Sequence, residues 1–432
     1  LFNIVSKPPE QEVQDEDVFQ ALDQPDQIYN DSFEDNPQDT VATDIIEETT
    51  PLQLDINDLE PSIELDDEAF QSLAEIAKQG EFGGRSAKGK KGLIKSQGGN
   101  EGSEAAVVRG LKWLADIQLP DGSWSFSEIG ASPDPGELSD CKMGATGMAL
   151  MAFLGAGHTH KKDGPYKNSV MGGLSYLMNN ARLTPAGADF RAKSNQGNMY
   201  VHGICVIALA EAYGMTKDLP LRKAAEGGIA FIINAQHSGN GGWHYDPNPK
   251  SPDTSVVGWQ VMALISGHGA KIRIPKNVLT GASNFLNTVE AQDDKYVYYG
   301  YNAPAKGRPA LTAVGLLCRM YLGWDTDNEN LKKGVAYLAS VGPSNNEYYN
   351  YYATQVMHHW GGEVWTKWNE VMRDQLINTQ AIEGVEAGSW KPGTGHAGPG
   401  GRLYTTVLNI MCLEVYYRHL PLYQRNAVQA DF

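Results

Sequence analysis

The sequence predicts an all-α fold: an (α/α)6 toroid of six helical hairpins closed into a double barrel, preceded by an extended acidic N-terminal arm. Three observations support this prediction: an apolar helix that recurs along the chain, an amphipathic helix before most of its copies, and an uneven distribution of charge. We expect an acidic arm at 1–78, a flexible Gly/Ser/Lys-rich linker at 79–103 and the toroid at 104–432.

The recurring helix has the apolar pattern SVVGWQVMAL, seen at 255–264. Aligning the central residue of each copy gives six positions: Gly147, Gly203, Gly258, Gly315, Ala353 and Val407. Four of the five intervals lie between 54 and 57 residues, and the fifth is 38. Each copy is apolar on nearly every side, which indicates a helix that is buried all round. A closed ring of such units needs no capping repeats, whereas an open solenoid does.

A more amphipathic helix precedes most copies, as in VVRGLKWLADIQ at 107–118 and VLTGASNFLNT at 278–288. We therefore predict six buried inner helices that alternate with six outer ones, and no strand beyond short loop hairpins. Four inner-helix side chains should be nearly fully buried: Met151, Ile207, Met262 and Met411.

Three loops share a Gln-Gly-Trp signature: QLPDGSW at 118–124, QHSGNGGW at 236–243 and QAIEGVEAGSW at 380–390. The glutamine, at the end of an outer helix, is suited to bond free backbone groups, and the tryptophan is suited to cap the next hairpin. These loops resemble the Gln–Trp repeats of squalene–hopene cyclases, and the hairpins resemble those of protein prenyltransferase β subunits. The resemblance covers 104–432 and implies the toroid of that superfamily.

The catalytic residues of that superfamily are not matched. Proton-initiated terpenoid cyclases open an inner helix with Asp-x-Asp-Asp-Thr, and the matching segment here, at 250–254, is KSPDT. Proline stands where the resemblance places the acid, and proline cannot donate a proton. Asp253 is instead expected to cap the following helix. The Asp-x-Cys and His zinc ligands of prenyltransferases have no counterpart, and adjacent His358 and His359 diverge by about 100° on a helix.

Polar and aromatic residues gather where the inner helices are predicted to start. Helix dipoles favour anionic or hydroxyl-rich ligands there, and aromatic side chains with a few polar groups are typical of a ligand pocket. The binding candidates at this cavity mouth are Lys142, Asn198, Tyr200, His202, His244, Tyr245, Asp253, Tyr348, Tyr352 and Arg402. The same pattern is typical of a barrel end plugged by its own loops, and a lone histidine such as His202 on an apolar helix is typical of a core residue.

The arm has 22 acidic residues against two lysines, a composition typical of disorder. Two stretches, 15–22 and 66–78, place apolar residues at helical spacing and predict docking helices that bind a protein partner or a second copy. The docking residues are Phe19, Leu22, Phe70, Leu73 and Ile76. The basic residues of 79–103 lack interleaved aromatic side chains, so we expect no nucleic-acid partner.

No stretch approaches the roughly 20 apolar residues that span a bilayer. The chain begins at Leu1 rather than Met, and we expect membrane contact only through an upstream anchor. The sequence favours a bacterial cell envelope or periplasm over the cytoplasm. We expect no cofactor, no metal site and no disulfide. The four cysteines, Cys141, Cys205, Cys318 and Cys412, lack metal-ligand spacing, and the last three lie in apolar helical runs.

Three functions are compatible with these features. We favour a non-catalytic toroid that acts as a scaffold or binding module in a larger, envelope-associated assembly, with the arm docked on a neighbour, because the catalytic motifs are absent. One alternative is a terpenoid-cyclase-like or other toroid enzyme that uses the central polar and aromatic cavity. Another is a protein that binds a small molecule there, a glycan or a lipid, without turnover.

Overall fold

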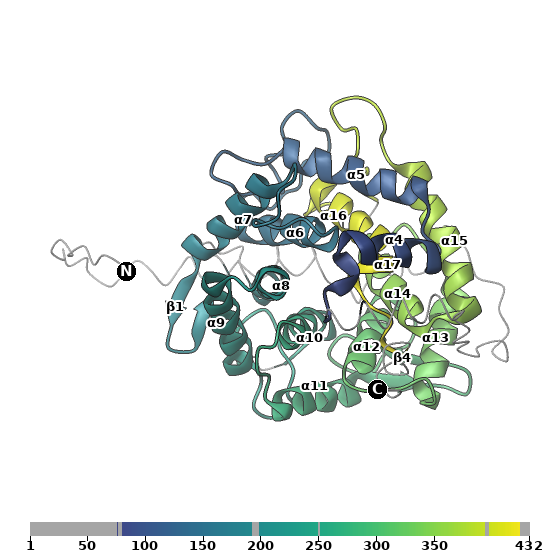
Figure 1. Cartoon of the computed structure of the whole chain (residues 1–432). Coiled ribbons are helices and arrows are strands. Elements are labelled where there is room, and N and C mark those ends of the chain that lie inside the picture. The colour runs from purple at the N-terminus through teal and green to yellow at the C-terminus, as the bar shows by residue number, and fades with distance from the viewer. Residues whose placement is uncertain (1–75, 77–79, 192–197, 249–250, 394–396, 424–432) are drawn as a thin grey trace.

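The computed structural model describes residues 76, 80–191, 198–248, 251–393 and 397–423. Figure 1 shows an outer ring of helices surrounding an inner ring. The inner helices are α6 (Lys142–Gly155), α8 (Met199–Thr216), α10 (Thr254–Gly269), α12 (Pro309–Tyr321), α14 (Glu347–Trp360) and α16 (Gly401–Leu413). The outer helices are α5 (Glu101–Asp116), α7 (Lys167–Asn180), α9 (Leu219–Ala235), α11 (Lys276–Val289), α13 (Glu329–Val341) and α15 (Gly362–Thr379).

The ring is closed. Each inner helix packs against the next, and α16 packs against both α5 and α6. The inner helices are buried on nearly every side, whereas an outer helix such as α11 buries one face and exposes the other. Among the described helices, α8 alone is long and apolar enough to span a membrane, yet 83% of it is buried within the barrel, as in a core helix. The predicted (α/α)6 toroid is confirmed.

Strands in the described residues form two antiparallel hairpins, each between an outer helix and the next inner one. The pairs are β1 (Arg182–Thr184) with β2 (Gly187–Asp189), and β3 (Glu290–Gln292) with β4 (Val297–Tyr299). In the first hairpin Arg182 lies opposite Asp189, and their side chains form an ion pair. This agrees with the prediction of short loop hairpins.

The Gln-Gly-Trp loops join neighbouring hairpins. Gln118 Nε2 donates to Gly122 O in its own loop at 2.8 Å and to Ser169 O in α7 at 2.9 Å. The same two bonds recur after α9 and after α15. Trp124 donates from Nε1 back to Leu114 O of the preceding outer helix at 2.7 Å, and its backbone N–H donates to Thr146 Oγ1 of the next inner helix at 3.0 Å. The tryptophan therefore ties an outer helix to an inner one.

Residues 79–103 differ from the flexible linker that the sequence predicts. The described part contains a 3-10 helix, η2 (Gly83–Arg85), then α4 (Ala87–Ser96) and the start of α5. We call residues 80–97 the strap; it packs against α17 (Val415–Arg418), near the centre of the ring in Figure 1. The strap has few apolar residues, so its composition resembles that of a linker. Buried polar contacts hold it in place instead, above all those of Arg85.

The arm lies mostly outside the described residues, and so do four of its proposed docking residues: Phe19, Leu22, Phe70 and Leu73. The fifth, Ile76, is described, is only 5% exposed and belongs to the hydrophobic core. Docking of the arm on a partner stays a prediction.

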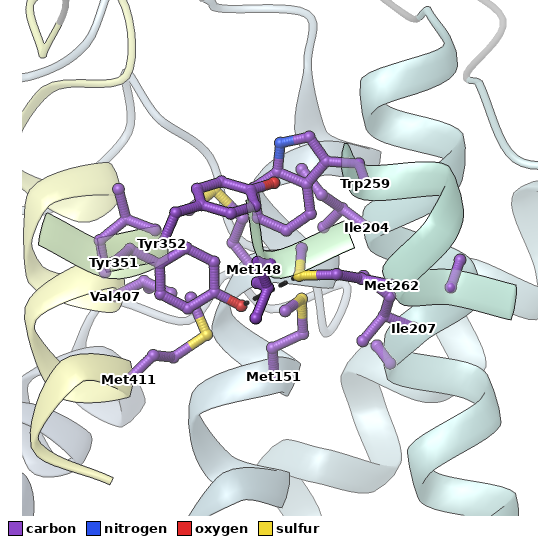
Figure 2. Close-up of a cluster of buried hydrophobic side chains, with 14 of the residues drawn as sticks. Met148, Met151, Ile204, Ile207, Trp259, Met262, Tyr351, Tyr352, Val407 and Met411 are labelled. Carbon is purple, nitrogen blue, oxygen red and sulfur yellow. Dashed lines mark hydrogen bonds between the residues drawn. The ribbon is translucent and has the colours of Figure 1, made fainter. Parts of the chain in front are cut away.

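Side chains from five inner helices fill the middle of the barrel. Figure 2 shows Met148, Met151, Ile204, Ile207, Trp259, Met262, Tyr351, Tyr352, Val407 and Met411 gathered there. The four side chains predicted to be buried are at most 6% exposed, which confirms that prediction. We call this cluster of side chains the central plug. It leaves the barrel with two separate ends. We call them the N-terminal mouth and the C-terminal mouth, after the ends of the inner helices that surround them.

Candidate functional site

Five of the candidate residues lie at the starts of inner helices, around the N-terminal mouth. Lys142 is the first residue of α6 and Asn198 is the N-cap of α8. Asp253 is the N-cap of α10, and Tyr348 and Arg402 are the second residues of α14 and α16. The remaining question is which side chains face a ligand.

Asp253 anchors a buried hydrogen-bond chain. Its Oδ1 accepts from Val256 N at 2.8 Å, the helix cap that the sequence predicts, and from Ser255 Oγ at 2.7 Å. Ser255 Oγ in turn accepts from Tyr200 Oη at 2.6 Å. Burial, together with the charge of Asp253, raises the pKa of Tyr200 well above its usual value. Tyr200 therefore stays protonated and serves as a donor.

His244 lies in front of this buried carboxylate. Its Nε2 is 3.8 Å from Asp253 Oδ2; the histidine side chain is 30% exposed, and that of Asp253 is fully buried. Backbone bonds fix the loop, because Asp253 N donates to Trp243 O and Met199 N donates to Tyr245 O, each at 2.9 Å. The result is an imidazole that reaches solvent with a carboxylate behind it, an arrangement suited to proton transfer.

Tyrosine rings extend from this pair. Tyr245 packs edge-on against His244 with centroids 4.2 Å apart and against Tyr200 at 5.7 Å. Its hydroxyl lies 3.2 Å from that of Tyr301, which comes from the loop after β4. Tyr245 and Tyr301 are half-buried, so they offer both apolar ring edges and hydroxyl groups to a ligand.

On the α14 side, Tyr348 packs against Tyr352 at 4.9 Å, and Tyr352 packs edge-on against Trp259 of the central plug at 5.9 Å. Tyr348 also acts electrostatically on the Tyr200 phenol, so α14 borders the same group of tyrosines as α8. These buried rings connect the start of α14 to the side chains that fill the middle of the barrel.

Sequence reasoning missed Glu347, the first residue of α14. The residue is half-buried, its Oε1 accepts from Gly393 N at 3.0 Å, and burial raises the pKa of its carboxyl. It acts electrostatically on Tyr404 of α16, another buried phenol whose pKa is well above the usual value. Its position directly before Tyr348 was the signal that could have found it.

His202 is placed elsewhere. Its Nδ1 accepts from Phe190 N at 3.1 Å, and its Nε2 lies 3.0 Å from Gly228 O in α9. Burial lowers its pKa to about 4, so the ring is neutral near pH 7. With both nitrogens bonded to backbone between α8 and the outer layer, His202 is a core histidine and is removed from the binding candidates.

Arg402, Lys142 and Asn198 shape the mouth rather than face its centre. Arg402 donates to Pro133 O at 2.9 Å and to Ser389 Oγ at 3.0 Å, and it pairs with Asp134, so it clamps the 125–140 loop onto α16. Lys142 Nζ is 3.1 Å from Glu128 Oε1 in the same loop. Asn198 Oδ1 accepts from Tyr200 N at 2.9 Å as a cap.

In the part of the chain that the structure describes, no group of three or more His, Cys, Asp or Glu side chains is placed to hold a metal ion. The four cysteines are free and buried. His358 has no hydrogen-bond partner among the described residues, and burial lowers its pKa to about 3.

No protein-family model and no curated protein matches the chain. Solved structures do match. An inactive variant of an α-1,6-mannanase from Salegentibacter sp. HEL1_6, in complex with α-1,6-mannotriose, is 11% identical with a TM-score of 0.51, over 73% of this chain and 99% of that one. An α-mannanase of glycoside hydrolase family 76 from Bacteroides thetaiotaomicron is 13% identical with a TM-score of 0.51, over 75% of this chain and 97% of that one. A type II terpene cyclase from Scytonema is 10% identical with a TM-score of 0.46, over 73% of this chain and 96% of that one.

At these identities the two mannanases establish the toroid fold and nothing finer. The resemblance to the squalene-cyclase superfamily therefore holds only at the level of the toroid. The preference for a non-catalytic protein is corrected, because the matching toroids are enzymes and the fold gives no ground for excluding catalysis. The expectations of a scaffold role, of a protein partner and of an envelope location stay predictions.

Proposed function

We propose that the N-terminal mouth binds an oligosaccharide and hydrolyses a glycosidic bond in it. The observation that carries this proposal is the partly exposed His244, backed at 3.8 Å by the buried carboxylate of Asp253, in a mouth lined with tyrosines. The mannanases of the same fold, one of them bound to α-1,6-mannotriose, support a sugar as the substrate class.

Binding rests on Tyr245 and Tyr301. Their rings supply apolar edges for the faces of a sugar, and their hydroxyl groups, 3.2 Å apart, supply donors and acceptors for its hydroxyls. The N-termini of the inner helices add a positive field, which favours electron-rich oxygen atoms at this mouth.

Hydrolysis needs a general acid for the leaving oxygen and a general base for water. Glu347 supplies the acid, because its raised pKa keeps the carboxyl protonated to higher pH than in an exposed glutamate. His244 Nδ1, the ring nitrogen that does not face Asp253, accepts a proton from water, whose oxygen bonds to the anomeric carbon. The glycosidic C–O bond breaks, and the leaving oxygen takes the proton of Glu347.

Most glycosidases use two carboxylates. Here Asp253 has no exposed surface and cannot touch a water molecule in the mouth, whereas His244 in front of it can. Asp253 therefore orients the imidazole and stabilises its protonated form, as the carboxylate does in other histidine–carboxylate pairs.

The test is sugar release from α-1,6-mannotriose and a panel of other oligosaccharides by the full chain. We expect hydrolysis of at least one panel member. We also expect His244→Ala and Glu347→Gln each to lower kcat by about 10²-fold or more. His268→Ala, at the opposite mouth, and Glu363→Gln, in the first turn of an outer helix, are the matched controls and should leave kcat unchanged.

Calorimetry on the same panel separates the outcomes. Saturable binding without sugar release would identify a glycan-binding protein and contradict the hydrolytic step. Neither binding nor release, in a protein with a cooperative melting transition, would contradict the proposal as a whole.

A further inference from the structure

A cavity of about 270 Å³ lies at the C-terminal mouth, beneath the strap. Its floor is apolar and comes from Met151, Ile207 and Met262, the underside of the central plug. Phe82 of the strap and Leu420, after α17, line it as well. The plug separates this cavity from the N-terminal mouth, so what binds here is independent of the proposed hydrolysis.

One wall of the cavity is a buried cluster of ion pairs. Arg85 of the strap donates to both carboxylate oxygens of Glu211, at 2.8 and 2.9 Å. Arg418 of α17 donates from Nη2 to the same two oxygens, at 3.1 Å each. Arg418 Nη1 also lies 3.3 Å from Glu414 Oε2. A single carboxylate, that of Glu211, thus bridges two guanidinium groups.

Two residues that line the cavity each have a side-chain atom with no partner among the described residues: Arg418 Nε and His419 Nε2. Both atoms are buried, and both residues line the cavity. An N–H group that is buried without an acceptor costs about 1–3 kcal/mol. The Arg418 side chain is only 1% exposed, so bulk solvent does not supply the missing partner. The wall therefore holds one unmet donor, Arg418 Nε–H, and a second one, His419 Nε2, in the tautomer that carries the proton on this nitrogen.

The cluster is also short of negative charge. Burial raises the pKa of Glu414 to about 8, so at pH 7 that carboxyl is mostly protonated. The two arginines are then balanced by Glu211 alone, which leaves the buried cluster with one excess positive charge. Lys90 also acts on Glu414, and the half-buried Glu81 is the other carboxylate on the cavity rim.

We infer that this cavity binds an amphipathic carboxylate, a medium-chain fatty acid in its chemistry, with the head on Arg418 Nε and His419 Nε2. The chain lies on Met151, Ile207 and Met262, and the flexible, polarisable side chains of the two methionines adapt to an apolar chain. A cavity of about 150 Å³ holds benzene, so 270 Å³ accommodates octanoate, which has ten non-hydrogen atoms. The exposed His268 and the half-buried Ser266 mark the rim where the ligand enters.

Titration calorimetry of the full chain with octanoate tests this assignment. We expect saturable binding with one site per chain, weaker binding of octan-1-ol and no saturable binding of octyltrimethylammonium, which has the same chain length and the opposite charge. Ser266→Trp should fill the cavity from its rim and weaken octanoate binding at least tenfold. Ser340→Trp, on an exposed position of α13, is the matched control and should bind octanoate normally.

His419→Phe gives a second, independent test, because it keeps an aromatic ring at the cavity and removes one partner of the head group. It should weaken octanoate binding and leave octan-1-ol binding unchanged, in a protein whose melting temperature shows that it is folded. Absence of saturable octanoate binding to the unmodified chain would overturn the inference. Equal binding of the ammonium probe, or octanoate affinity unaffected by both Ser266→Trp and His419→Phe, would overturn it as well.

Discussion

Gln380, which follows the last outer helix, donates from Nε2 to the carbonyl oxygen of Ala106 in the first outer helix at 2.8 Å. The two residues are 274 positions apart, and their bond joins the two ends of the ring. The same nitrogen donates to Gly388 O in its own loop, also at 2.8 Å. Gln118 and Gln236 make the equivalent pair of bonds between neighbouring hairpins, so one recurring contact both links and closes the toroid.

Gln380→Ala should destabilise the toroid by about 1–3 kcal/mol, because it leaves two backbone carbonyls without their donor in a buried seam. Urea denaturation followed by circular dichroism measures the loss. Gln292→Ala, at an exposed position of β3, is the control and should lie within about 0.5 kcal/mol of the unmodified protein. Equal stability of the two variants would show that packing alone closes the ring.

Arg85→Met should release the strap. Removing one partner of a buried ion pair costs about 3–5 kcal/mol, and we expect the lower end of that range because Arg418 still compensates Glu211. Amide exchange in 87–96 should speed up strongly while exchange in α8 stays slow. Lys91→Ala, on the exposed face of α4, should change neither. Unchanged exchange in α4 after Arg85→Met would mean that apolar contacts hold the strap.

Glu414 should make stability fall between about pH 6.5 and pH 8. The folded protein keeps its proton up to about pH 8, whereas an ordinary glutamate loses it near 4.5, so the folded state binds more protons in this range and loses stability as pH rises. The expected loss is up to about 2 kcal/mol over 1.5 pH units. Buried histidines such as His158 and His202, with pKa values lowered to about 4, act in the opposite direction near pH 6.5, where an unfolded histidine is still about half protonated. The contribution of Glu414 is therefore the difference in slope between the unmodified protein and Glu414→Gln.

Glu414→Gln should remove this decline, since glutamine keeps the shape of the side chain and does not titrate. Glu383→Gln, at an exposed position, should keep the decline. Urea midpoints at pH 6.5, 7.2 and 8.0 measure the slope. A slope that persists unchanged in Glu414→Gln would assign it to another group.

Tyr245→Ala should weaken binding of the oligosaccharide that the protein hydrolyses about tenfold, which corresponds to about 1.4 kcal/mol. The ring packs on His244 and pairs with Tyr301, so its loss removes both an apolar face and a hydroxyl from the mouth. Calorimetry with Tyr296→Ala, in the loop between β3 and β4, provides the control. Equal affinities of the two variants would place the sugar away from this tyrosine.

Much of the fold could be predicted from the sequence, because inner helices buried on all sides carry an apolar pattern at regular intervals. That register also placed Asp253 at a helix N-cap, where its carboxylate accepts from Val256 N. The strap could not be predicted in this way. Its main anchor joins Arg85 to Glu211, which are 126 residues apart in the sequence. A contact between such distant residues cannot be predicted from a local sequence pattern.

The candidate site was predicted less completely. Inner-helix starts are adjacent around a ring, so Tyr200 and Asp253 were expected near one another, and they are linked through Ser255. On a helix that is apolar on every side, the sequence pattern does not indicate which neighbour a given side chain faces. His202 was therefore included among the candidates, although it points to α9. Glu347 was overlooked because its pKa is raised by burial in the folded protein, which the local sequence does not report.

The claim that a sugar occupies the N-terminal mouth is tested most directly by hydrogen–deuterium exchange of the Glu347→Gln variant with saturating α-1,6-mannotriose, since this variant should bind without turnover. Our account predicts slower exchange in 243–246, 300–302 and 346–349, the segments that carry His244, Tyr301 and Tyr348. It predicts no change in the strap. Protection confined to 80–97 and 415–422, or protection in none of these segments, would contradict it.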